Sequence, residues 1–493
     1  MTTTATETTI LESKQFVGGD WTPADSGATF DDTDPYTGEI VARVPAGTAD
    51  DARRAIEAAA AAFPEWSKAP PAARQGIFLR AADILESRQD EIVSLLARET
   101  GCSFGFGMFQ MGFVPGLFRQ AAGLAYAPLG EILPSDLPGA FAMGMRRPVG
   151  VVAAIAPWNA ALILSARAIS APLALGNTVV LKPSEESPVV GGLVWGEIFT
   201  EAGLPGGVLN IVTHGRGEAG PIGAEFTDNP LVRRINFTGS TATGRKLAEA
   251  AGRNLKRVLL ELGGYNPLIV LADADLDYAV DASAFGAFLH QGQICMSARK
   301  IIVERGIADE FTERLAQKTS GLKVGDPKEH DTIIGPLITE RALETVKGRV
   351  DDAVSKGARV LAGGNAVGTC FEATLLADVP ADSELATLET FGPVAAIEVV
   401  DTPKQAVERA NATTYGLAAG ILTRDPDRGL ALAEALQSGI VHINDQPVHD
   451  EPQMPFGGVK ESGWGRFGGT AAIDEFTELR WVTVQSGTRP FPF

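Results

Sequence analysis

Apolar residues recur at helical spacing in the Ala-rich stretch between residues 50 and 100. The recurring positions are Ala52, Ile56, Ala59, Ile77, Leu79, Ala82, Leu85, Ile92, Leu95 and Leu96. Because residues three and four positions apart share one face of an α-helix, this pattern predicts amphipathic helices.

From about residue 150 the pattern changes to short apolar runs that alternate with helical stretches. The runs predict strands at 151–154, 178–181, 208–212, 234–237 and 258–260. The stretches between them predict helices at 165–175, 189–202, 217–224 and 242–251. Strands and helices that alternate in this way indicate βαβ units and a parallel, doubly wound sheet.

A second alternation of the same kind follows. Strands are predicted at 267–271, 300–303, 359–362, 394–400, 418–422 and 440–443, and helices at 404–410 and 427–435 and before His290. The fold class is therefore α/β, with two doubly wound α/β domains that meet near Gly263 and Gly264. A seam between domains is a common place for a small-molecule site.

Two segments fit neither α/β domain. Residues 125–145 contain the run Glu131 to Gly139 (EILPSDLPG) and predict a protruding hairpin. Residues 480–484 predict an edge strand near the C-terminus. We see no internal repeat and no low-complexity tract.

Composition and charge narrow the class of protein. At 493 residues the chain is too long for one ordinary core, and 45% hydrophobic with 21% charged residues is usual for a globular protein. The net charge of −19 argues against a nucleic-acid partner, which needs a basic surface. The most apolar region, 149–181, is broken by Pro157, Asn159, Arg167, Pro172 and Asn177, so no membrane span is expected.

The three cysteines, Cys102, Cys295 and Cys370, are an odd number, so at least one thiol is free. A free thiol favours a reducing compartment. The polar, Thr-rich start of the chain shows no secretory pattern. We therefore expect a cytoplasmic protein.

Cys295 is the candidate nucleophile. It lies in the run HQGQICMS (residues 290–297), where Gly292 and Gln293 interrupt the preceding helix and place the thiol at an element boundary. A thiolate attacks carbonyl groups when its pKa is lowered or a base is near. The alternative is a small buried hydrophobic residue, which is how Cys102 and Cys370 are interpreted.

Two polar residues follow predicted strands and are candidates for the same chemistry. Glu261 ends an apolar run and precedes two glycines in LELGG, where parallel-sheet enzymes place ligands. Asn159 follows Pro157 and Trp158 after another strand. A thiol, a carboxylate and an amide can supply a nucleophile, a base and an oxyanion donor. Alternatively, Glu261 is a loop charge and Asn159 satisfies turn backbone groups.

Two turns suggest a dinucleotide site. Lys182 and Glu185 follow the strand at 178–181 and can hold the hydroxyls of an adenosine ribose; Glu185 would repel a 2′-phosphate, whereas Lys182 acts in the opposite sense. NAD is thus favoured, and NADP stays open. The turn FTGSTATG (237–244) leads from a strand into a helix, where glycines let the backbone approach phosphate. Gly215 and Gly217 form a further glycine turn.

The three motifs around Asn159, Glu261 and Cys295, in this order, resemble the aldehyde dehydrogenase superfamily. The resemblance runs from about Phe16 to the C-terminus, and the flanking residues look like the benzaldehyde, vanillin and salicylaldehyde dehydrogenases. It implies that Cys295 attacks the aldehyde, that Glu261 activates the hydrolytic water, and that Asn159 and the backbone N–H of the cysteine hold the oxyanion.

The resemblance also implies a set of cofactor-binding residues. Glu389 would bind the nicotinamide ribose, and Phe391 would pack on the nicotinamide. The other positions are Ile155, Pro157, Trp158, Lys182, Ser184, Glu185, Gly215, Phe237, Gly239, Ser240 and Leu262; no metal site is expected. Residues 1–124 and 147–263 would form the NAD-binding domain and 264–460 the catalytic domain. Segments 125–146 and 470–493 would build an oligomerisation element, giving a homodimer or homotetramer.

Three stretches favour an aromatic substrate by their likeness to that branch: 134–139, 291–297 and 449–458. The Phe-, Met- and Gly-rich region 104–118 suits an aryl ring, or is simply core. Arg167 could reach a ring substituent or serve as a salt-bridge partner, so no catalytic role is assigned to it.

The expected function is NAD-dependent oxidation of an aromatic aldehyde to the acid, through a thiohemiacetal and a thioester. Oxidation of aliphatic aldehydes or semialdehydes is one alternative. A CoA-acylating dehydrogenase has less need of Glu261, and a non-catalytic protein on the same fold has no need of the thiol or the base.

Overall fold

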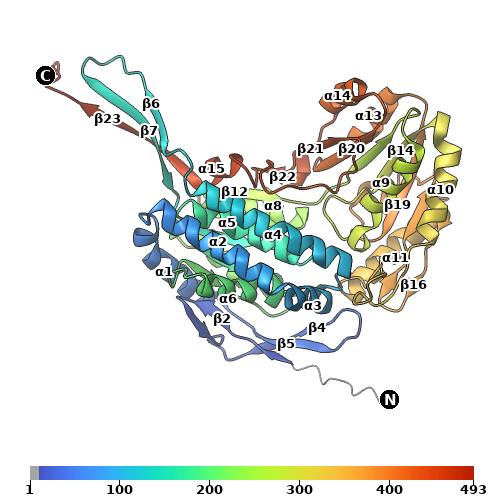
Figure 1. Ribbon diagram of the computed structural model, residues 1–493, viewed down its shortest axis with the longest axis horizontal. Helices are drawn as coiled ribbons and strands as arrows, with labels where there is room; N and C mark the ends of the chain where they lie inside the picture. Colours follow the sequence, from blue (N-terminus) through green and yellow to red (C-terminus); the bar gives the residue numbers. More distant parts are fainter. Residues whose placement is uncertain (1–9) are drawn as a thin grey trace.

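The computed structural model describes residues 10–493, and two sheets dominate it (Figure 1). The first sheet has the order β22-β12-β11-β8-β9-β10-β2-β3. Its parallel strands are β8 (Val151–Ile155), β9 (Thr178–Lys182), β10 (Leu209–Ile211), β11 (Val232–Thr238) and β12 (Arg257–Glu261). All five predicted strands are confirmed. The antiparallel strands β2 (Gln15–Val17), β3 (Asp20–Thr22) and β22 (Gly463–Trp464) extend the edges.

Helices cover both faces of this sheet, because both faces of its central strands are apolar. Val152, Ala154, Val179 and Leu181 belong to one core cluster, while Val151, Ala153, Ile155 and Val180 belong to another. The first cluster includes residues of α2 (Pro71–Ser87), α3 (Gln89–Thr100), α4 (Phe104–Leu124), α5 (Ala161–Ala174) and α6 (Val194–Glu201). The second includes α1 (Ala49–Trp66), α7 (Ala219–Asp228) and α8 (Thr241–Arg253). The helix predicted at 189–202 begins as a π-helix, Val189–Leu193.

The second sheet has the order β15-β18-β19-β14-β13-β20-β21. Its strands are β13 (Pro267–Val270), β14 (Lys300–Glu304), β15 (Arg359–Ala362), β18 (Thr374–Ala377), β19 (Val394–Val400), β20 (Ala418–Leu422) and β21 (Ile440–Ile443). The helices are α9 (Leu276–Phe288), α10 (Ala308–Ser320), α11 (Glu340–Ser355), α12 (Glu384–Thr387), α13 (Pro403–Asn411) and α14 (Pro426–Ala435). The chain crosses from the first sheet to the second between Glu261 and Pro267, as expected.

The second sheet departs from the prediction at one edge. β18, which was not predicted, lies between β19 and β15. It pairs with β19 in parallel and with β15 in antiparallel orientation. The run TLLA is short and follows glycine-containing turns, so its pattern alone could not be separated from a loop. The fold class, with two α/β units built on mostly parallel sheets, is confirmed.

A three-stranded arm projects from the body of the molecule (Figure 1). It consists of β6 (Gly130–Leu133), β7 (Ala140–Pro148) and β23 (Thr477–Gln485) in the order β23-β7-β6. All nine residues of β7 pair with the nine of β23. The predicted hairpin and edge strand are therefore confirmed, with β23 longer than expected.

Short elements complete the fold. β1 (Leu11–Glu12), β4 (Thr29–Thr33) and β5 (Ile40–Pro45) form a small sheet that the sequence did not predict, since TFDDT lacks apolar alternation. The others are β16 (Ala366–Val367), β17 (Cys370–Phe371) and α15 (Ala471–Phe476). Within residues 10–493, no helix combines the length and apolar character needed to cross a membrane.

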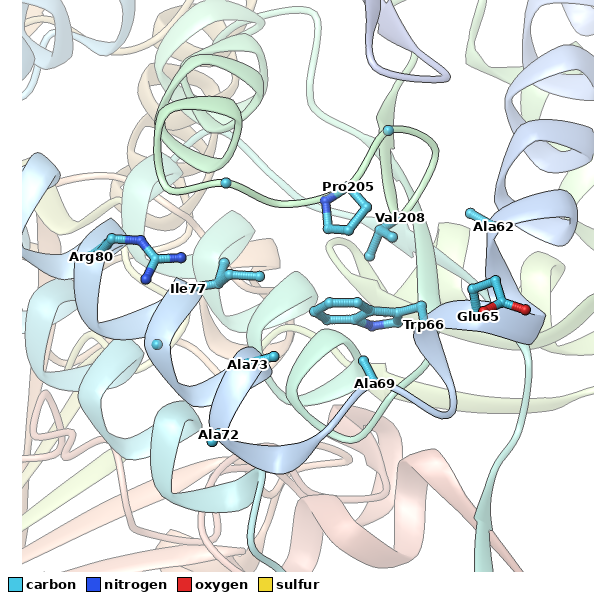
Figure 2. A pocket seen from close by; sticks show the side chains of 13 residues that line it. Ala62, Glu65, Trp66, Ala69, Ala72, Ala73, Ile77, Arg80, Pro205 and Val208 are labelled. Carbon is cyan, nitrogen blue, oxygen red and sulfur yellow. The ribbon is translucent and has the colours of Figure 1, made fainter.

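A cavity of about 470 Å³ lies between α1, α2 and the loop 203–208 (Figure 2). Trp66, Ile77 and Pro205 line it, and its charged side chains are Glu65 and Arg80. The Arg80 guanidinium already donates to the carbonyl oxygen of Ala202. This cavity shares no lining residue with the pocket around Cys295 described below.

Candidate active site

The backbone before Cys295 leaves the helical path abruptly. α9 ends at Phe288, and His290, Gln291 and Gly292 then adopt positive φ angles of 48°, 52° and 63°. A Cβ on Gly292 would lie 2.2 Å from the carbonyl oxygen of Gly392, so a side chain cannot fit there. The thiol is therefore carried by an irregular loop, as the glycine in HQGQICMS suggested.

Two buried polar side chains hold this loop. The Arg299 guanidinium, 3% exposed, donates to the carbonyl oxygens of Gly292, Ile294 and Gly392. The Asn266 amide donates to the carbonyl oxygen of Cys295 at 2.6 Å and to that of Ser297 at 3.0 Å. Sequence reasoning missed both residues, since nothing in the pattern around an Arg or Asn beside a strand shows that it is buried.

Asn159 and Cys295 line one pocket. Asn159 lies in the loop between β8 and α5 and is 4% exposed. Its Nδ2 donates to the carbonyl oxygen of Gln293, two residues before the thiol, at 3.0 Å. An amide nitrogen carries two protons, so one remains for another acceptor. The structure thus brings together two of the three predicted catalytic residues.

Glu261 ends β12 and is 1% exposed. Neither of its carboxyl oxygens has a hydrogen-bond partner among the described residues. Burial raises the pKa of this carboxyl to about 8, with the charge of Arg167 opposing the rise and that of Asp450 adding to it. Burial also raises the pKa of the Cys295 thiol well above its usual value, and Glu261 adds to that rise. Both groups hold their protons at neutral pH.

Gly263 and Gly264 allow three motifs to converge. A Cβ on Gly264 would lie 2.7 Å from the carbonyl oxygen of Cys295, and one on Gly263 would lie 2.3 Å from Oε2 of Glu389. The backbone N–H of Gly264 donates to Oε1 of Glu389 at 3.2 Å. The absence of side chains after Glu261 is what lets the thiol loop and Glu389 approach this strand end.

Trp158, Glu389 and Phe391 line a second pocket of about 280 Å³, together with Gln293. The rings of Trp158 and Phe391 meet edge to face, with centroids 5.6 Å apart. Pro157 lies half-buried in the same loop as Trp158. Three predicted cofactor residues therefore line one space.

Lys182, Ser184 and Glu185 lie at the carboxyl end of β9. Nζ of Lys182 donates to the carbonyl oxygen of Pro183 at 3.0 Å and lies 2.6 Å from Nε2 of His214. The Ser184 hydroxyl donates to Oε2 of Glu185, which is 3.6 Å from the same ring nitrogen. His214 was not predicted; it directly precedes Gly215, which was.

The geometry fixes the tautomer of His214. Its Nδ1 lies 2.9 Å from the carbonyl oxygen of Gly215, which can only accept, so Nδ1 carries the proton. Nε2 then accepts from the Lys182 ammonium. Burial and the charge of Lys182 lower the pKa of His214 to about 4, which keeps the ring neutral. Burial also lowers the pKa of Lys182 to about 8.

The pKa of the Glu185 carboxyl is lowered, although burial by itself would raise it. Burial raises the pKa of its carboxyl, but the neighbouring His214 and Lys182 outweigh that effect and bring the pKa below its usual value. Glu185 is therefore a carboxylate at neutral pH, suited to accept hydrogen bonds from ribose hydroxyls.

The predicted phosphate turn also has the expected form. Ser240 caps α8, and its hydroxyl oxygen accepts from the backbone N–H of Thr243 at 3.3 Å. A Cβ on Gly239 would lie 2.5 Å from the Phe237 ring, so a side chain does not fit at this position. Ile155 and Leu262 are 8% and 5% exposed and belong to the same core cluster as Phe237. A helix N-terminus beside a bare backbone suits phosphate.

The walls of the thiol pocket are mostly apolar. They comprise Phe106, Phe109, Ala160, Ile163, Leu164, Ile294, Met296, Val448 and Phe456, together with Arg167 and Asp450. Phe106 and Phe109 belong to α4, within the region 104–118 singled out above. Arg167 forms a buried ion pair with Asp450. Of the two roles considered for Arg167 from the sequence, the structure therefore shows that of a salt-bridge partner. Within residues 10–493, no group of three or more metal-ligating side chains is placed to hold an ion.

Comparison with known proteins agrees with this geometry. The profile of the aldehyde dehydrogenase family matches residues 21–482. The chain is 47% identical to a vanillin dehydrogenase of Pseudomonas fluorescens, covering 98% of this chain and 100% of that protein. It is 43% identical to a benzaldehyde dehydrogenase [NAD(+)] of Pseudomonas putida, covering 95% of each.

Solved structures show the same fold. The crystal structure of a salicylaldehyde dehydrogenase from Pseudomonas putida G7, complexed with salicylaldehyde, superposes with a TM-score of 0.96 at 41% identity, covering 98% of this chain and 100% of that chain. An NADP-dependent enzyme of E. coli superposes with a TM-score of 0.93 at 36% identity, covering 97% and 98%. The match to the family profile, the sequence identities and their coverage together show that the chain belongs to the aldehyde dehydrogenase family.

Proposed function

We propose that this protein oxidises aromatic aldehydes to carboxylic acids with NAD. One observation carries the proposal: Cys295 and Asn159 open into a single pocket whose remaining walls are largely aromatic and aliphatic. Apolar walls of this kind suit a flat aryl ring. Relatives are named as vanillin and benzaldehyde dehydrogenases, and a structural neighbour holds salicylaldehyde.

Cys295 is the proposed nucleophile, and its thiol must lose its proton before attack. The proposed acceptor is the ionised form of Glu261, which with a pKa of about 8 is the minor form at neutral pH and the main form above pH 8. Attack of the thiolate on the aldehyde carbon gives a thiohemiacetal. The second N–H of Asn159 and the backbone N–H of Cys295 would then donate to its oxyanion.

Collapse of the thiohemiacetal leaves a thioester on Cys295. When bound, NAD supplies the hydride acceptor for this step. Glu261 releases the proton taken from the thiol to solvent before hydrolysis. A water then gives a proton to the Glu261 carboxylate and attacks the thioester carbon; the C–S bond breaks to release the acid, and the proton on Glu261 passes to the Cys295 thiolate, which restores the thiol. Holding the water is the proposed task of Glu261 in the second half of the cycle. Neither carboxyl oxygen has a hydrogen-bond partner within residues 10–493, so both can accept from the water.

The residues present fit NAD. Glu185 is a carboxylate beside Lys182, and it would accept from a 2′-hydroxyl and repel a 2′-phosphate. The N-terminus of α8 with Gly239 and Ser240 would hold the pyrophosphate, with Gly215, Ile155, Pro157, Phe237 and Leu262 around it. Glu389 and Phe391, beside Trp158, would hold the nicotinamide ribose and ring. NADP remains the less favoured cofactor.

Residues 1–124 and 147–263, which contain every strand of the first sheet except β22, are our proposed NAD-binding domain. Residues 264–460, which contain the second sheet, are the proposed catalytic domain. The arm, within 125–146 and 470–493, is the proposed oligomerisation element of a homodimer or homotetramer. Its side chains Ile132, Leu479, Trp481 and Val484 are 73%, 64%, 81% and 53% exposed, an apolar surface that calls for a partner. We place the protein in the cytoplasm, in line with its three free cysteines.

The test is NADH formation with benzaldehyde, vanillin, salicylaldehyde, acetaldehyde and succinic semialdehyde, with NADP in parallel. We expect the highest kcat/KM on the aryl aldehydes with NAD. A preference for succinic semialdehyde or acetaldehyde would discard the substrate class. Acid formation independent of added CoA would exclude the CoA-acylating alternative.

A matched variant tests the nucleophile. Cys295→Ala should abolish turnover and keep NAD binding, whereas Cys102→Ala, which changes a buried thiol elsewhere, should keep both. Turnover by Cys295→Ala would overturn the assignment.

A further inference from the structure

One charged pair interrupts the apolar wall of the thiol pocket. Arg167 comes from α5, and Asp450 comes from the loop after β21. Their side chains are only 5% and 10% exposed. Burying two charges is costly, so a pair in this position calls for an explanation beyond fold stability.

Only one of the two carboxylate oxygens of Asp450 has a hydrogen-bond partner among the described residues. Its Oδ2 accepts a hydrogen bond from Nη2 of Arg167. Its Oδ1 is buried and has no hydrogen-bond partner among the described residues. A buried acceptor on a pocket wall that lacks a partner in the protein is suited to a donor on the ligand.

Arg167 is held in place by aromatic rings. Its guanidinium carbon lies 4.3 Å from the ring centroid of Phe456 and 5.7 Å from that of Phe113. These contacts restrict the guanidinium and, through the ion pair, the direction of the Asp450 carboxylate. Because Asp450 neutralises Arg167, the pocket offers no net positive charge to a substrate carboxylate.

We propose that Oδ1 of Asp450 accepts a hydrogen bond from a hydroxyl group on the aromatic ring of the substrate, so that this pocket selects phenolic aldehydes. Arg167 is a positioning residue for that carboxylate. The inference rests on the proposed function and names its substrate class. A methyl group has a similar size but no proton to donate, and a ring carboxylate would meet the negative charge of Asp450.

The test compares hydroxyl with methyl at each ring position. kcat/KM is measured for 2-, 3- and 4-hydroxybenzaldehyde, for the three methylbenzaldehydes, for 4-carboxybenzaldehyde, and for benzaldehyde as the reference. We expect the hydroxyl compound to exceed its methyl partner by about tenfold or more at one ring position, the size of effect usual for a hydrogen bond to a charged group. We expect 4-carboxybenzaldehyde to be the poorest substrate.

Two variants test the residue. Asp450→Asn replaces the charged acceptor by an amide, and the double variant Arg167→Met with Asp450→Leu removes the pair without leaving an unpaired buried charge. Both should reduce the hydroxyl-to-methyl ratio of kcat/KM about tenfold, and the double variant should bring it to about one. Glu451→Gln, an acid-to-amide change at the neighbouring residue outside the pocket lining, should leave the ratio unchanged.

The outcomes separate the two proposals. If the wild-type protein oxidises benzaldehyde but shows no hydroxyl preference at any position, the inference about Asp450 fails and the proposed function stands. A preference that persists in both variants also overturns it. If the protein oxidises no aryl aldehyde with NAD, the proposed function itself fails.

Discussion

Nε2 of His214 accepts a hydrogen bond from Nζ of Lys182 across 2.6 Å, while Nδ1 of the ring donates to the carbonyl oxygen of Gly215. The ring therefore bridges the ends of two neighbouring strands, β9 and β10. Of the three protons on the Lys182 ammonium, one goes to His214 and one to Pro183, which leaves one for a ligand. His214 thus sets the direction of the remaining donor.

Replacement of His214 should weaken cofactor binding without touching the chemistry. His214→Ala removes one hydrogen bond to Lys182, so KM for NAD should rise roughly two- to tenfold while kcat stays unchanged. His214→Gln, whose side-chain oxygen can accept from the ammonium, should recover part of the loss. Initial rates at saturating aldehyde and varied NAD measure this, and a fall in kcat at constant KM would contradict the positioning role.

The pH dependence of NAD binding should follow Lys182. Its pKa is lowered to about 8, so the side chain is charged below that pH and loses its charge and one donor above it. We expect KM for NAD to be constant from pH 6 to 7.5 and to rise above about pH 8. In Lys182→Met the KM should be higher throughout and the rise should disappear. A persistent rise in that variant would assign the titration to another group.

Glu261 should control kcat rather than cofactor binding. Its pKa is raised to about 8, so the carboxyl is protonated below that pH and becomes a base above it. Where thioester hydrolysis limits the rate, kcat should increase through about pH 8. Glu261→Gln should lower steady-state kcat by roughly 10²- to 10⁴-fold. Glu249→Gln, on the exposed face of α8, is the matched control.

A rapid-mixing experiment distinguishes the two halves of the cycle. Because Glu261 is proposed to act in both halves, Glu261→Gln should lose the burst of NADH together with steady-state turnover. A retained burst close to one NADH per active site would confine the role of this carboxyl to thioester hydrolysis.

Asn159 should contribute through its amide donor. Asn159→Ala removes that donor from the pocket, and kcat/KM should fall by about a hundredfold, or roughly 3 kcal/mol of barrier. Asn159→Asp should be at least as poor, because a carboxylate would repel the oxyanion. NAD binding, followed by protein fluorescence, should be retained in both variants; its loss would point to collapse of the loop that Asn159 ties to Gln293.

The sequence was sufficient for the parallel strands other than β18, because most of their apolar runs are bounded by Gly, Pro or Asn. It was also sufficient for Cys295 and Asn159, whose motifs place them at element ends that the structure brings into one pocket. It failed for β4 and β18, whose stability comes from partners distant in the chain. No local pattern reports such pairing.

Supporting residues were also beyond the sequence, for a different physical reason. Arg299, His214 and Asp450 matter because they are buried, and burial depends on packing between segments tens to hundreds of residues apart. An Arg, a His or an Asp in a sequence is most often solvated. Only the folded chain shows that Arg299 fixes the thiol loop and that Asp450 lines the pocket.

The arm provides a test of assembly. Trp481 pairs with Gly144 across β23 and β7 and is 81% exposed, so its indole would be buried only by another chain. Trp481→Glu places a charge on that surface and should shift the protein toward smaller species in sedimentation velocity, since burial of an unpaired charge opposes association. Val367→Glu, at an exposed apolar residue of the β16–β17 hairpin, is the control and should leave the sedimentation coefficient unchanged. If Trp481→Glu sediments as the wild-type protein does, the arm is not the contact that joins the subunits.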